Sequence, residues 1–349
     1  MNFIPSFTDL RKISDQTQIS SSPKLKIAIL ADFSSQLLRV AIDGISKLKG
    51  MHLEIFESEF DQIDLQLYDK NSQLHEFSPD WVLLFQNNTR LKEKYFKFDK
   101  KEEFSAHISE IITNYNTIIT KDIKAGCIIS NYFNEKDGVF GSFSAKVVSS
   151  FGFQLGKINS KIHDLILKNK RTYLLDISGL IAREGFKNTI DWRMSLNASM
   201  PFSLNFLPTI AYDVFSVMRN ELGDIKKCVV VDLDDTMWGG IIGDDGIQNI
   251  EIGDLGIGKV YKEFQSWLKS LKERGIILAV CSKNEEKIAK EPFETHPEMV
   301  LKLDDISVFV ANWNNKAENI KFIQQVLNIG LDSMVFLDDN PMERDLVMN

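Results

Sequence analysis

The stretch Asp232-Leu233-Asp234-Asp235-Thr236 directly follows Cys228-Val229-Val230-Val231, an apolar run that predicts a short buried strand. It places two carboxylates, those of Asp232 and Asp234, two positions apart where that strand ends. In open α/β sheets, reactive groups gather outside the carboxyl ends of the strands. The stretch therefore predicts a reactive site or, as the simpler alternative, an aspartate-rich turn that closes the strand.

Three later stretches repeat this arrangement and favour the reactive site. The apolar run Ile276 to Val280 leads into Cys281-Ser282-Lys283-Asn284, and Met334 to Leu337 leads into Asp338-Asp339-Asn340-Pro341. Between them, Asn312 to Lys316 opens a helical pattern of apolar residues. Strands that alternate with helices predict right-handed βαβ units in one parallel sheet. We therefore expect these polar residues to converge on one edge of that sheet.

These motifs, in this order, resemble the haloacid dehalogenase superfamily of phosphatases and phosphotransferases, which work through an aspartyl phosphate. The resemblance implies that Asp232 is the nucleophile and Asp234 the general acid and base. It also implies a set of residues that bind the phosphoryl group, namely Thr236, Ser282, Lys283, Asn284 and Lys316.

The same resemblance implies a Mg²⁺ site. Its predicted residues are Asp232, Asp234, Asp338 and Asp339, with Asp339 as the direct ligand of the last pair and Asp338 as the partner that supports it. The chemistry requires such a site, because a carboxylate that attacks an anionic phosphate needs a hard cation to offset the repulsion. Asp234 would protonate the leaving oxygen, which favours phosphoryl transfer over dehalogenation, since a halide leaves without a proton.

The motif spacing leaves little room for a lid over this site. Between Asp232 and Ser282, a predicted helix and strand leave only Met237 to Gly258, whose glycines indicate a short hairpin flap and not a cap domain. The segment between Ser282 and Lys316 is filled by a predicted helix and strand. An open site suits a bulky or protein-tethered substrate better than a small enclosed one.

The composition predicts a soluble cytoplasmic protein. A net charge of −8, from 41 Lys and Arg against 49 Asp and Glu, argues against a general nucleic-acid or anionic-membrane binder. The three cysteines have no metal-binding or disulfide spacing, which fits a reducing compartment. No apolar stretch approaches the ~20 residues of a membrane span, and the polar start of the chain lacks a signal-peptide core.

A chain of 349 residues is expected to form two domains. We predict an N-terminal extension over residues 1–23, an α/β domain over 24–224 and a second α/β domain over 225–349. Both are expected to be Rossmann-like three-layer folds with parallel sheets, the second resembling haloacid dehalogenases without a large cap. The strands expected in the first domain are Lys24 to Leu30, Trp81 to Phe85, Gly126 to Ser130 and Tyr173 to Ile177.

From about Lys24 onward the chain resembles the FkbH-like proteins, whose capless phosphatase domain follows a domain similar to SGNH hydrolases. The stretches that carry this resemblance are Asp176 to Leu180, Asp191 to Arg193, Asp232 to Gly240, Cys281 to Asn284 and Leu337 to Arg344. The resemblance implies transfer of a glyceryl unit from a small phosphorylated three-carbon acid to the phosphopantetheine thiol of an acyl carrier protein. It also implies further chain beyond Asn349, where the predicted last helix stops early.

The first domain departs from the hydrolase pattern. SGNH hydrolases carry Gly-Asp-Ser after the first strand, where this chain has Ala31-Asp32-Phe33-Ser34. The histidine expected three residues after an aspartate is replaced by Met194. Without the serine and the histidine base, a catalytic triad cannot form, so we expect a noncatalytic domain that docks the carrier. Ser34 remains a candidate nucleophile if the loop is shifted by one residue.

Two classes of function remain open. The first is a Mg²⁺-dependent phosphohydrolase or phosphotransferase, which the acid/base residue Asp234 favours. The alternative is a noncatalytic scaffold that recognises a phosphorylated or pantetheinylated partner. Cys281 is a thioester-carrier candidate, but strand alternation turns it into the core if Ser282 faces the site.

Overall fold

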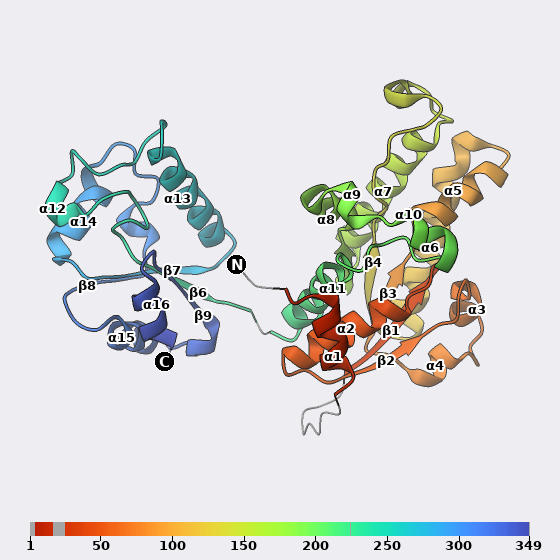
Figure 1. The fold of residues 1–349 in the computed structure, drawn as a ribbon, viewed down its shortest axis with the longest axis horizontal. Helices are drawn as coiled ribbons and strands as arrows, with labels where there is room; N and C mark the ends of the chain where they lie inside the picture. The colour runs from red at the N-terminus through yellow and green to blue at the C-terminus, as the bar shows by residue number, and fades with distance from the viewer. Residues whose placement is uncertain (1–3, 17–24, 224, 349) are drawn as a thin grey trace. The chain divides into compact units, whose positions relative to one another are not determined.

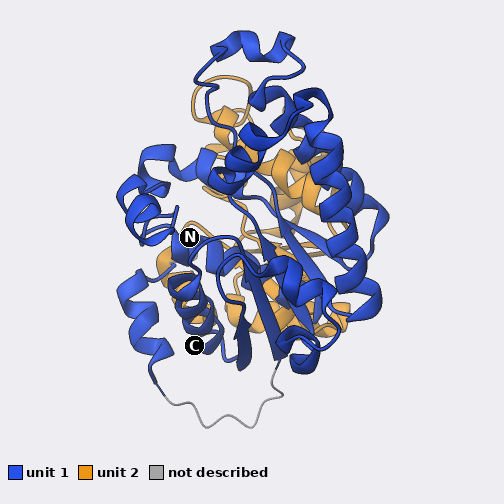
Figure 2. Cartoon of the chain, turned by 90° about the vertical axis from the view of Figure 1, so that its right-hand side faces the viewer, with its two compact units in different colours: residues 1–222 blue, residues 223–349 orange. Residues whose placement is uncertain are grey.

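The structure, a computed structural model, describes residues 4–16, 25–223 and 225–348. The chain divides into two compact units, residues 1–222 and 223–349 (Figure 2). Each unit has a sheet of parallel strands with helices on both faces (Figure 1). The predicted fold class, two three-layer α/β domains with parallel sheets, is therefore confirmed.

The sheet of the first unit has the strand order β2-β1-β3-β4-β5, and every neighbouring pair is parallel. Its strands are β1 (Leu25–Ala31), β2 (Leu53–Glu57), β3 (Trp81–Phe85), β4 (Gly126–Ser130) and β5 (Thr172–Leu175). The edge strand β2 was not predicted, because it is short, carries charge at Glu54 and Glu57 and buries only Leu53.

Helices cover both faces of this sheet. Along β1, Ile27 and Ile29 face a core shared with α1, α2, α8 and α11, whereas Ala28 and Leu30 face a core shared with α3 to α7. The helices are α1 (Phe7–Ser14), α2 (Gln36–Leu48), α3 (Ile63–Tyr68), α4 (Gln73–Phe77), α5 (Asn88–Lys97), α6 (Phe104–Thr117), α7 (Phe151–Lys168), α8 (Ile177–Glu184), α9 (Phe186–Thr189), α10 (Trp192–Ala198) and α11 (Leu207–Glu221). Short helical turns are η1 (Lys101–Glu103), η2 (Ile118–Asp122) and η3 (Gly141–Lys146).

Helix α1 lies within the stretch expected to be an extension, residues 1–23, of which residues 1–3 and 17–23 lie outside the described residues. The side chain of Ser6 caps α1 by accepting a hydrogen bond from the Asp9 amide, and Leu10 is fully buried against α2. Gly44 of α2 allows this contact, because a Cβ there would lie 2.5 Å from the Leu10 carbonyl oxygen. Residues 7–14 therefore belong to the core of the first unit.

The sheet of the second unit has the order β8-β7-β6-β9, again with parallel pairs. The strands are β6 (Cys228–Val231), β7 (Ile277–Ser282), β8 (Val308–Ala311) and β9 (Met334–Leu337). One face packs on α13 (Gly258–Glu273) and α14 (Glu286–Thr295), and the other on α15 (Lys316–Leu327) and α16 (Pro341–Met348) (Figure 1). The remaining turns are η4 (Leu303–Asp305) and η5 (Leu331–Ser333).

No large cap interrupts this sheet. Between β6 and α13 the chain makes one short helix, α12 (Ile242–Asp245), and one antiparallel pair of residues, Gly239 with Glu251. Their two backbone hydrogen bonds, 3.0 and 2.8 Å long, close the segment into a flap. Among the residues that the structure describes, no helix is long and apolar enough to cross a membrane.

Candidate active site

The predicted polar motifs of the second unit lie at one edge of its sheet. Asp232 follows β6, Ser282 ends β7, Asp338 follows β9 and Lys316 is the first residue of α15, which follows β8. Strand β6 lies between β7 and β9, and all these strands run parallel. The carboxyl ends of the strands therefore bring these residues together.

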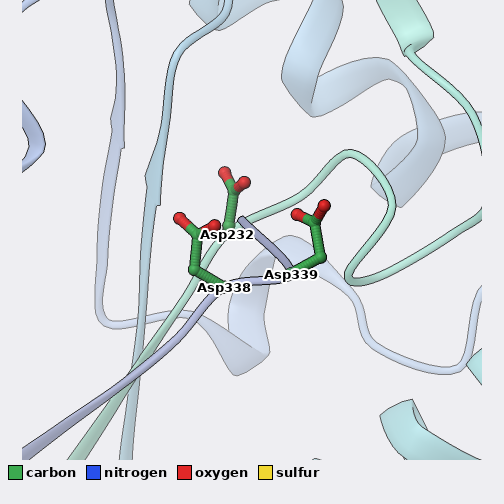
Figure 3. Close-up of side chains that lie close together, drawn as sticks. All are labelled: Asp232, Asp338 and Asp339. Carbon is green, nitrogen blue, oxygen red and sulfur yellow. The ribbon is translucent and has the colours of Figure 1, made fainter. Parts of the chain in front are cut away.

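Three carboxylates form the centre of this site. One carboxylate oxygen each from Asp232, Asp338 and Asp339 lies within 4.8 Å of the others (Figure 3). Asp232 and Asp338 are buried, whereas Asp339 is exposed to solvent. An all-oxygen set of this kind suits a hard divalent cation.

Lys316 joins two of these carboxylates from the side of α15. Its Nζ lies 2.9 Å from Asp232 Oδ2 and 2.6 Å from Asp338 Oδ2. The lysine side chain is 4% exposed and that of Asp338 is 0% exposed. The other oxygen of Asp338 accepts a hydrogen bond from the Asn340 amide at 2.8 Å. Asp338 is thus occupied in holding Lys316 and its own loop, which leaves Asp232 and Asp339 as the freer metal ligands.

Two observations indicate that these residues fit a divalent metal ion. Asp232 Oδ1 is buried and has no hydrogen-bond partner among the described residues, which is costly for a carboxylate oxygen unless a cation approaches it. The ionisable side chains that take part in the hydrogen bonds and ion pairs described at this strand edge are five acids and three bases. The acidic members are Asp232, Asp234, Asp338, Asp339 and Glu343, and the basic ones are Lys283, Lys316 and Arg344.

Burial raises the pKa of Asp232, and the neighbouring Lys316 ammonium opposes that rise. Burial would lower the pKa of Lys316, but Asp232 and Asp338 outweigh it and raise that pKa above its ordinary value. The lysine is therefore held as a cation between the two carboxylates. A bound divalent cation would further favour the charged form of Asp232.

Asp234 was predicted as a metal ligand, but its carboxylate lies outside the three-carboxylate group. Oδ1 accepts hydrogen bonds from Trp238 Nε1 and the Ile242 amide, both at 3.0 Å, and Oδ2 accepts one from Asn284 Nδ2 at 3.0 Å. Asp232 and Asp234 both lie beyond the end of β6, so strand alternation does not set their directions. The Asp232 carboxylate contacts Lys316, whereas the Asp234 carboxylate contacts the flap residues Trp238 and Ile242. Burial raises the pKa of Asp234 against these three hydrogen bonds. A role of Asp234 in metal binding stays a prediction.

Four of the five predicted phosphate-binding residues, Thr236, Lys283, Asn284 and Lys316, contact carboxylates in this structure. The Thr236 hydroxyl donates to Asp339 Oδ1 at 3.3 Å and accepts from the Asp339 amide at 3.1 Å. Asn284 donates to Asp234, as described above. Ser282 is 1% exposed at the end of β7, and Lys283 pairs with Glu343 at 2.5 Å. Phosphate binding by these five residues stays a prediction.

Three residues at this edge were not predicted from sequence. Trp238 is fully buried, and its indole nitrogen donates a hydrogen bond to the carboxylate of Asp234, four residues earlier. Arg344 Nη1 donates to the backbone carbonyls of Asp338 and Asp339 at 2.6 and 2.7 Å. Glu343 pairs with Lys283, 60 residues earlier in the chain. The sequence indicates only the contact of Trp238 with Asp234, because the two residues are four positions apart. The contacts of Arg344 and Glu343 depend on where α16 packs.

The cysteine beside this site is a core residue. Cys281 is fully buried in the cluster beneath α15. Burial raises the pKa of its thiol to about 12. A protonated, enclosed thiol is a poor nucleophile, which argues against Cys281 as a thioester carrier.

Mg²⁺ affinity is expected to depend on the exposed carboxylate. Replacing Asp339 with alanine should weaken Mg²⁺ binding at least about tenfold, because affinity follows the number of charged oxygen ligands. Isothermal titration calorimetry measures this directly, with Asp332→Ala on η5 as a control away from the strand edge. Unchanged affinity in the Asp339→Ala protein would exclude Asp339 as a ligand.

The first unit also gathers polar residues at the carboxyl edge of its sheet, but the nucleophile position is apolar. Phe33 is buried and meets Phe85 and Phe202 with ring centroids 4.9 and 5.7 Å apart. The Ser34 hydroxyl donates to Gln36 Oε1 at 2.5 Å. Asp191 caps α10 by accepting from the amides of Arg193 and Met194. In these contacts Ser34 has neither a histidine nor a carboxylate as its partner.

Asp32 is a buried acid in this unit whose ionisation opposes folding. Oδ1 accepts from the amide and side chain of Asn87 at 2.8 and 2.9 Å, yet burial raises the pKa of Asp32 from 3.8 to about 7. A pKa raised in the folded state contributes stability that is full below pH ~4 and lost as the pH rises through ~7.

Asp32→Asn should therefore become more stable than the parent as the pH rises from 5 to 8. The gain at pH 8 should be at most about 4 kcal/mol, at about 1.4 kcal/mol per pKa unit. Thermal unfolding at both pH values measures it, with the exposed Asp122→Asn as a control that should show no such trend. An equal loss of stability at both pH values would mean that Asp32 is not the titrating group.

The chain is similar to a solved structure over nearly its whole length. This structure is the N-terminal part of the protein BF1531 from Bacteroides fragilis, which contains a phosphatase domain and is complexed with Mg. The two chains are 42% identical, with a TM-score of 0.93, over 98% of this chain and 91% of the other.

Two further similarities are much weaker. The acetyl xylan esterase AlAXEase is 14% identical with a TM-score of 0.38, over 55% of this chain and 99% of that one. An acetyl-xylooligosaccharide esterase from Geobacillus is 13% identical with a TM-score of 0.35, over 59% of this chain and 97% of that one. None of the curated proteins matches the chain.

Fold and site together define a protein of two parallel α/β units, the second of the haloacid dehalogenase-like kind without a large cap. Residues 26–219 match the family described as FkbH, N-terminal domain. The chain therefore belongs to the FkbH family.

Proposed function

We propose that this chain is a Mg²⁺-dependent phosphohydrolase or phosphotransferase that works through an aspartyl phosphate on Asp232. The observation that carries this proposal is the Asp232 carboxylate itself. One oxygen faces Lys316, the other has no hydrogen-bond partner among the described residues, and two further carboxylates lie beside it. The Mg complex of the phosphatase-containing relative supports the same function here.

In the first step, an Asp232 oxygen attacks phosphorus and the bond from phosphorus to the leaving oxygen breaks. Asp234, held by Trp238 and Asn284, gives its proton to that leaving oxygen. In the second step, Asp234 takes a proton from a water molecule or another acceptor, which attacks phosphorus. The bond from phosphorus to Asp232 then breaks, and both carboxylates return to their starting states.

Charge around the phosphoryl group is balanced by a few side chains. Asp232 and Asp339 would hold Mg²⁺, which supplies positive charge that offsets the repulsion between carboxylate and phosphate. Lys316 and the Ser282 hydroxyl would face the phosphoryl oxygens. Asp338 orients Lys316 for this role through their 2.6 Å contact.

A phosphatase screen with and without Mg²⁺ tests the function, and intact-mass analysis under denaturing acid tests for a phosphoryl group on Asp232. Phosphate release that requires Mg²⁺ supports the proposal. Absence of release from every phosphate ester, together with Mg²⁺-independent binding of phosphorylated ligands, would favour the noncatalytic scaffold instead.

Asp234→Asn should turn over about 10²- to 10⁴-fold more slowly, the usual contribution of a general acid or base. An asparagine keeps the shape but cannot exchange the proton. Steady-state kinetics at saturating Mg²⁺ measures the change, and circular dichroism checks that the fold is retained. A variant as fast as the parent would remove Asp234 from the mechanism.

We propose further that the phosphorylated substrate is a small three-carbon acid. Where its carboxyl group itself carries the phosphate, the thiol of an acyl carrier protein attacks the carbonyl carbon, a thioester forms, and the bond from carbon to the phosphate oxygen breaks to release phosphate. Membership of the FkbH family and the flap of residues 237–257, too small to form a cap, support this assignment. The first unit, whose nucleophile position is occupied by Phe33, would then dock the carrier. Mass spectrometry of a holo carrier protein incubated with the enzyme and the acid phosphorylated at its carboxyl group tests it. Phosphate release without added mass on the carrier would leave simple hydrolysis.

A further inference from the structure

A second lysine lies at the same strand edge as Lys316 but is held in a different way. Lys283 follows Ser282 at the end of β7, and its Nζ lies 2.5 Å from Glu343 Oε1. Glu343 lies on α16, four residues after Asp339. This ion pair therefore joins the loops that follow β7 and β9, which both border the loop of Asp232.

The two lysines differ in exposure and in how their charge is balanced. Lys316 is 4% exposed and lies between two buried carboxylates at the centre of the site. Lys283 is 38% exposed and contacts one carboxylate, that of Glu343. An ammonium has three donors, so after Glu343 takes one, others stay open to a ligand.

Glu343 fixes the position of this cation. Its side chain is 15% exposed, and its second oxygen, Oε2, is buried without a hydrogen-bond partner in the part of the chain that the structure describes. A carboxylate in that situation depends on its one cationic partner, since an unpaired buried charge is costly. The ion pair thereby limits the conformations of the Lys283 side chain at the end of β7, although a free lysine side chain has four rotatable bonds.

We propose that Lys283, positioned by Glu343, forms a subsite for the carboxylate of the phosphorylated substrate. This inference rests on the proposed function, because it assumes that a phosphate ester occupies the Asp232 site. A carboxylate held by an ammonium forms a charge-assisted hydrogen bond, stronger than a neutral one. The phosphoryl group itself meets Lys316, Ser282 and the metal ligands, so Lys283 serves the second anionic group.

Two esters that differ only at the carboxylate test the subsite. 3-Phosphoglycerate carries a carboxylate where glycerol 3-phosphate carries a neutral hydroxymethyl group. The parent enzyme should prefer the acid in kcat/KM by about 10- to 100-fold, the range of a hydrogen bond to a charged group. Lys283→Met should remove most of that preference, Lys283→Arg should keep most of it, and Glu343→Gln should reduce it in part.

Lys290 and Glu286 provide a matched control pair. They also lie 2.5 Å apart, on α14, with side chains 33% and 56% exposed. Lys290→Met should therefore keep the full preference for the acid. If Lys283→Met weakens both esters equally, or if the parent shows no preference, the subsite is excluded.

Calorimetry separates failure of the subsite from failure of the proposed function. Both esters are titrated into the Asp232→Asn protein and into the same protein carrying Lys283→Met. Tighter binding of the acid that disappears with Lys283→Met supports the subsite even if the parent releases no phosphate. Phosphate release without any preference in turnover or binding supports the proposed function and excludes the subsite.

Discussion

Asp232→Asn is expected to abolish Mg²⁺-dependent phosphate release, with a loss of at least about 10⁴-fold, as for the removal of other covalent nucleophiles. An amide oxygen is a much weaker nucleophile than a carboxylate, and it also binds the cation less tightly. Phosphate release and the mass of the acid-quenched protein are the measurements. The parent should gain the mass of one phosphoryl group during turnover, and the variant should not.

Asp235→Asn is the matched control, because it makes the same substitution three residues away. Asp235 is exposed, its backbone has a φ of 51° that asparagine tolerates, and its Oδ1 accepts a hydrogen bond from the Gly240 amide. It should retain activity within a few fold. If the Asp232→Asn protein kept most of its turnover, the aspartyl phosphate mechanism would be wrong.

Lys316→Met should have the largest effect on stability. It removes the only cation within 4 Å of the carboxylate oxygens of Asp232 and Asp338 among the described residues, and it leaves two buried carboxylates unpaired. Breaking a buried ion pair by deleting one partner typically costs about 3–5 kcal/mol. Activity should also be lost, because the cation that faces the phosphoryl group is missing.

Urea unfolding of the Lys316→Met protein with and without Mg²⁺ measures this effect. Mg²⁺ should restore part of the lost stability, since it can neutralise the same carboxylates. The exposed pair control, Lys290→Met, should cost at most about 1 kcal/mol. A loss that small for Lys316→Met would show that the buried carboxylates do not depend on the lysine.

The strand ends of the second unit could be predicted from sequence because each signal is local. An apolar run of four or five residues followed by polar ones marks where a buried strand stops, as at Val231 and Leu337. The rule that parallel strands present their carboxyl ends at one edge then brings Asp232, Ser282 and Asp338 together. The edge strand β2 was not predicted because it is partly exposed and has no continuous apolar run.

The partners of each side chain could not be predicted in this way. Whether Asp234 faces the three-carboxylate group or the flap depends on its hydrogen bonds with Trp238 and Asn284, which are 4 and 50 residues away in the sequence. Thr236 contacts Asp339 across 103 residues of sequence. No periodicity in the chain encodes such contacts, because they depend on how the flap and the loops pack after the sheet has formed.

The amino-acid sequence by itself therefore determined the α/β class and the residue types at each strand end, since hydrophobic periodicity and strand polarity are local properties. It also determined that position 33 is phenylalanine and not serine, which removes the expected nucleophile of the first unit. Only the tertiary structure decided that Asp338 forms an ion pair with Lys316, that Glu343 forms one with Lys283, and that Asp234 lies apart from the three-carboxylate group. The physical reason is that hydrogen bonds and ion pairs act over about 3 Å and need both partners in place, whereas strand and helix patterns are written in neighbouring residues.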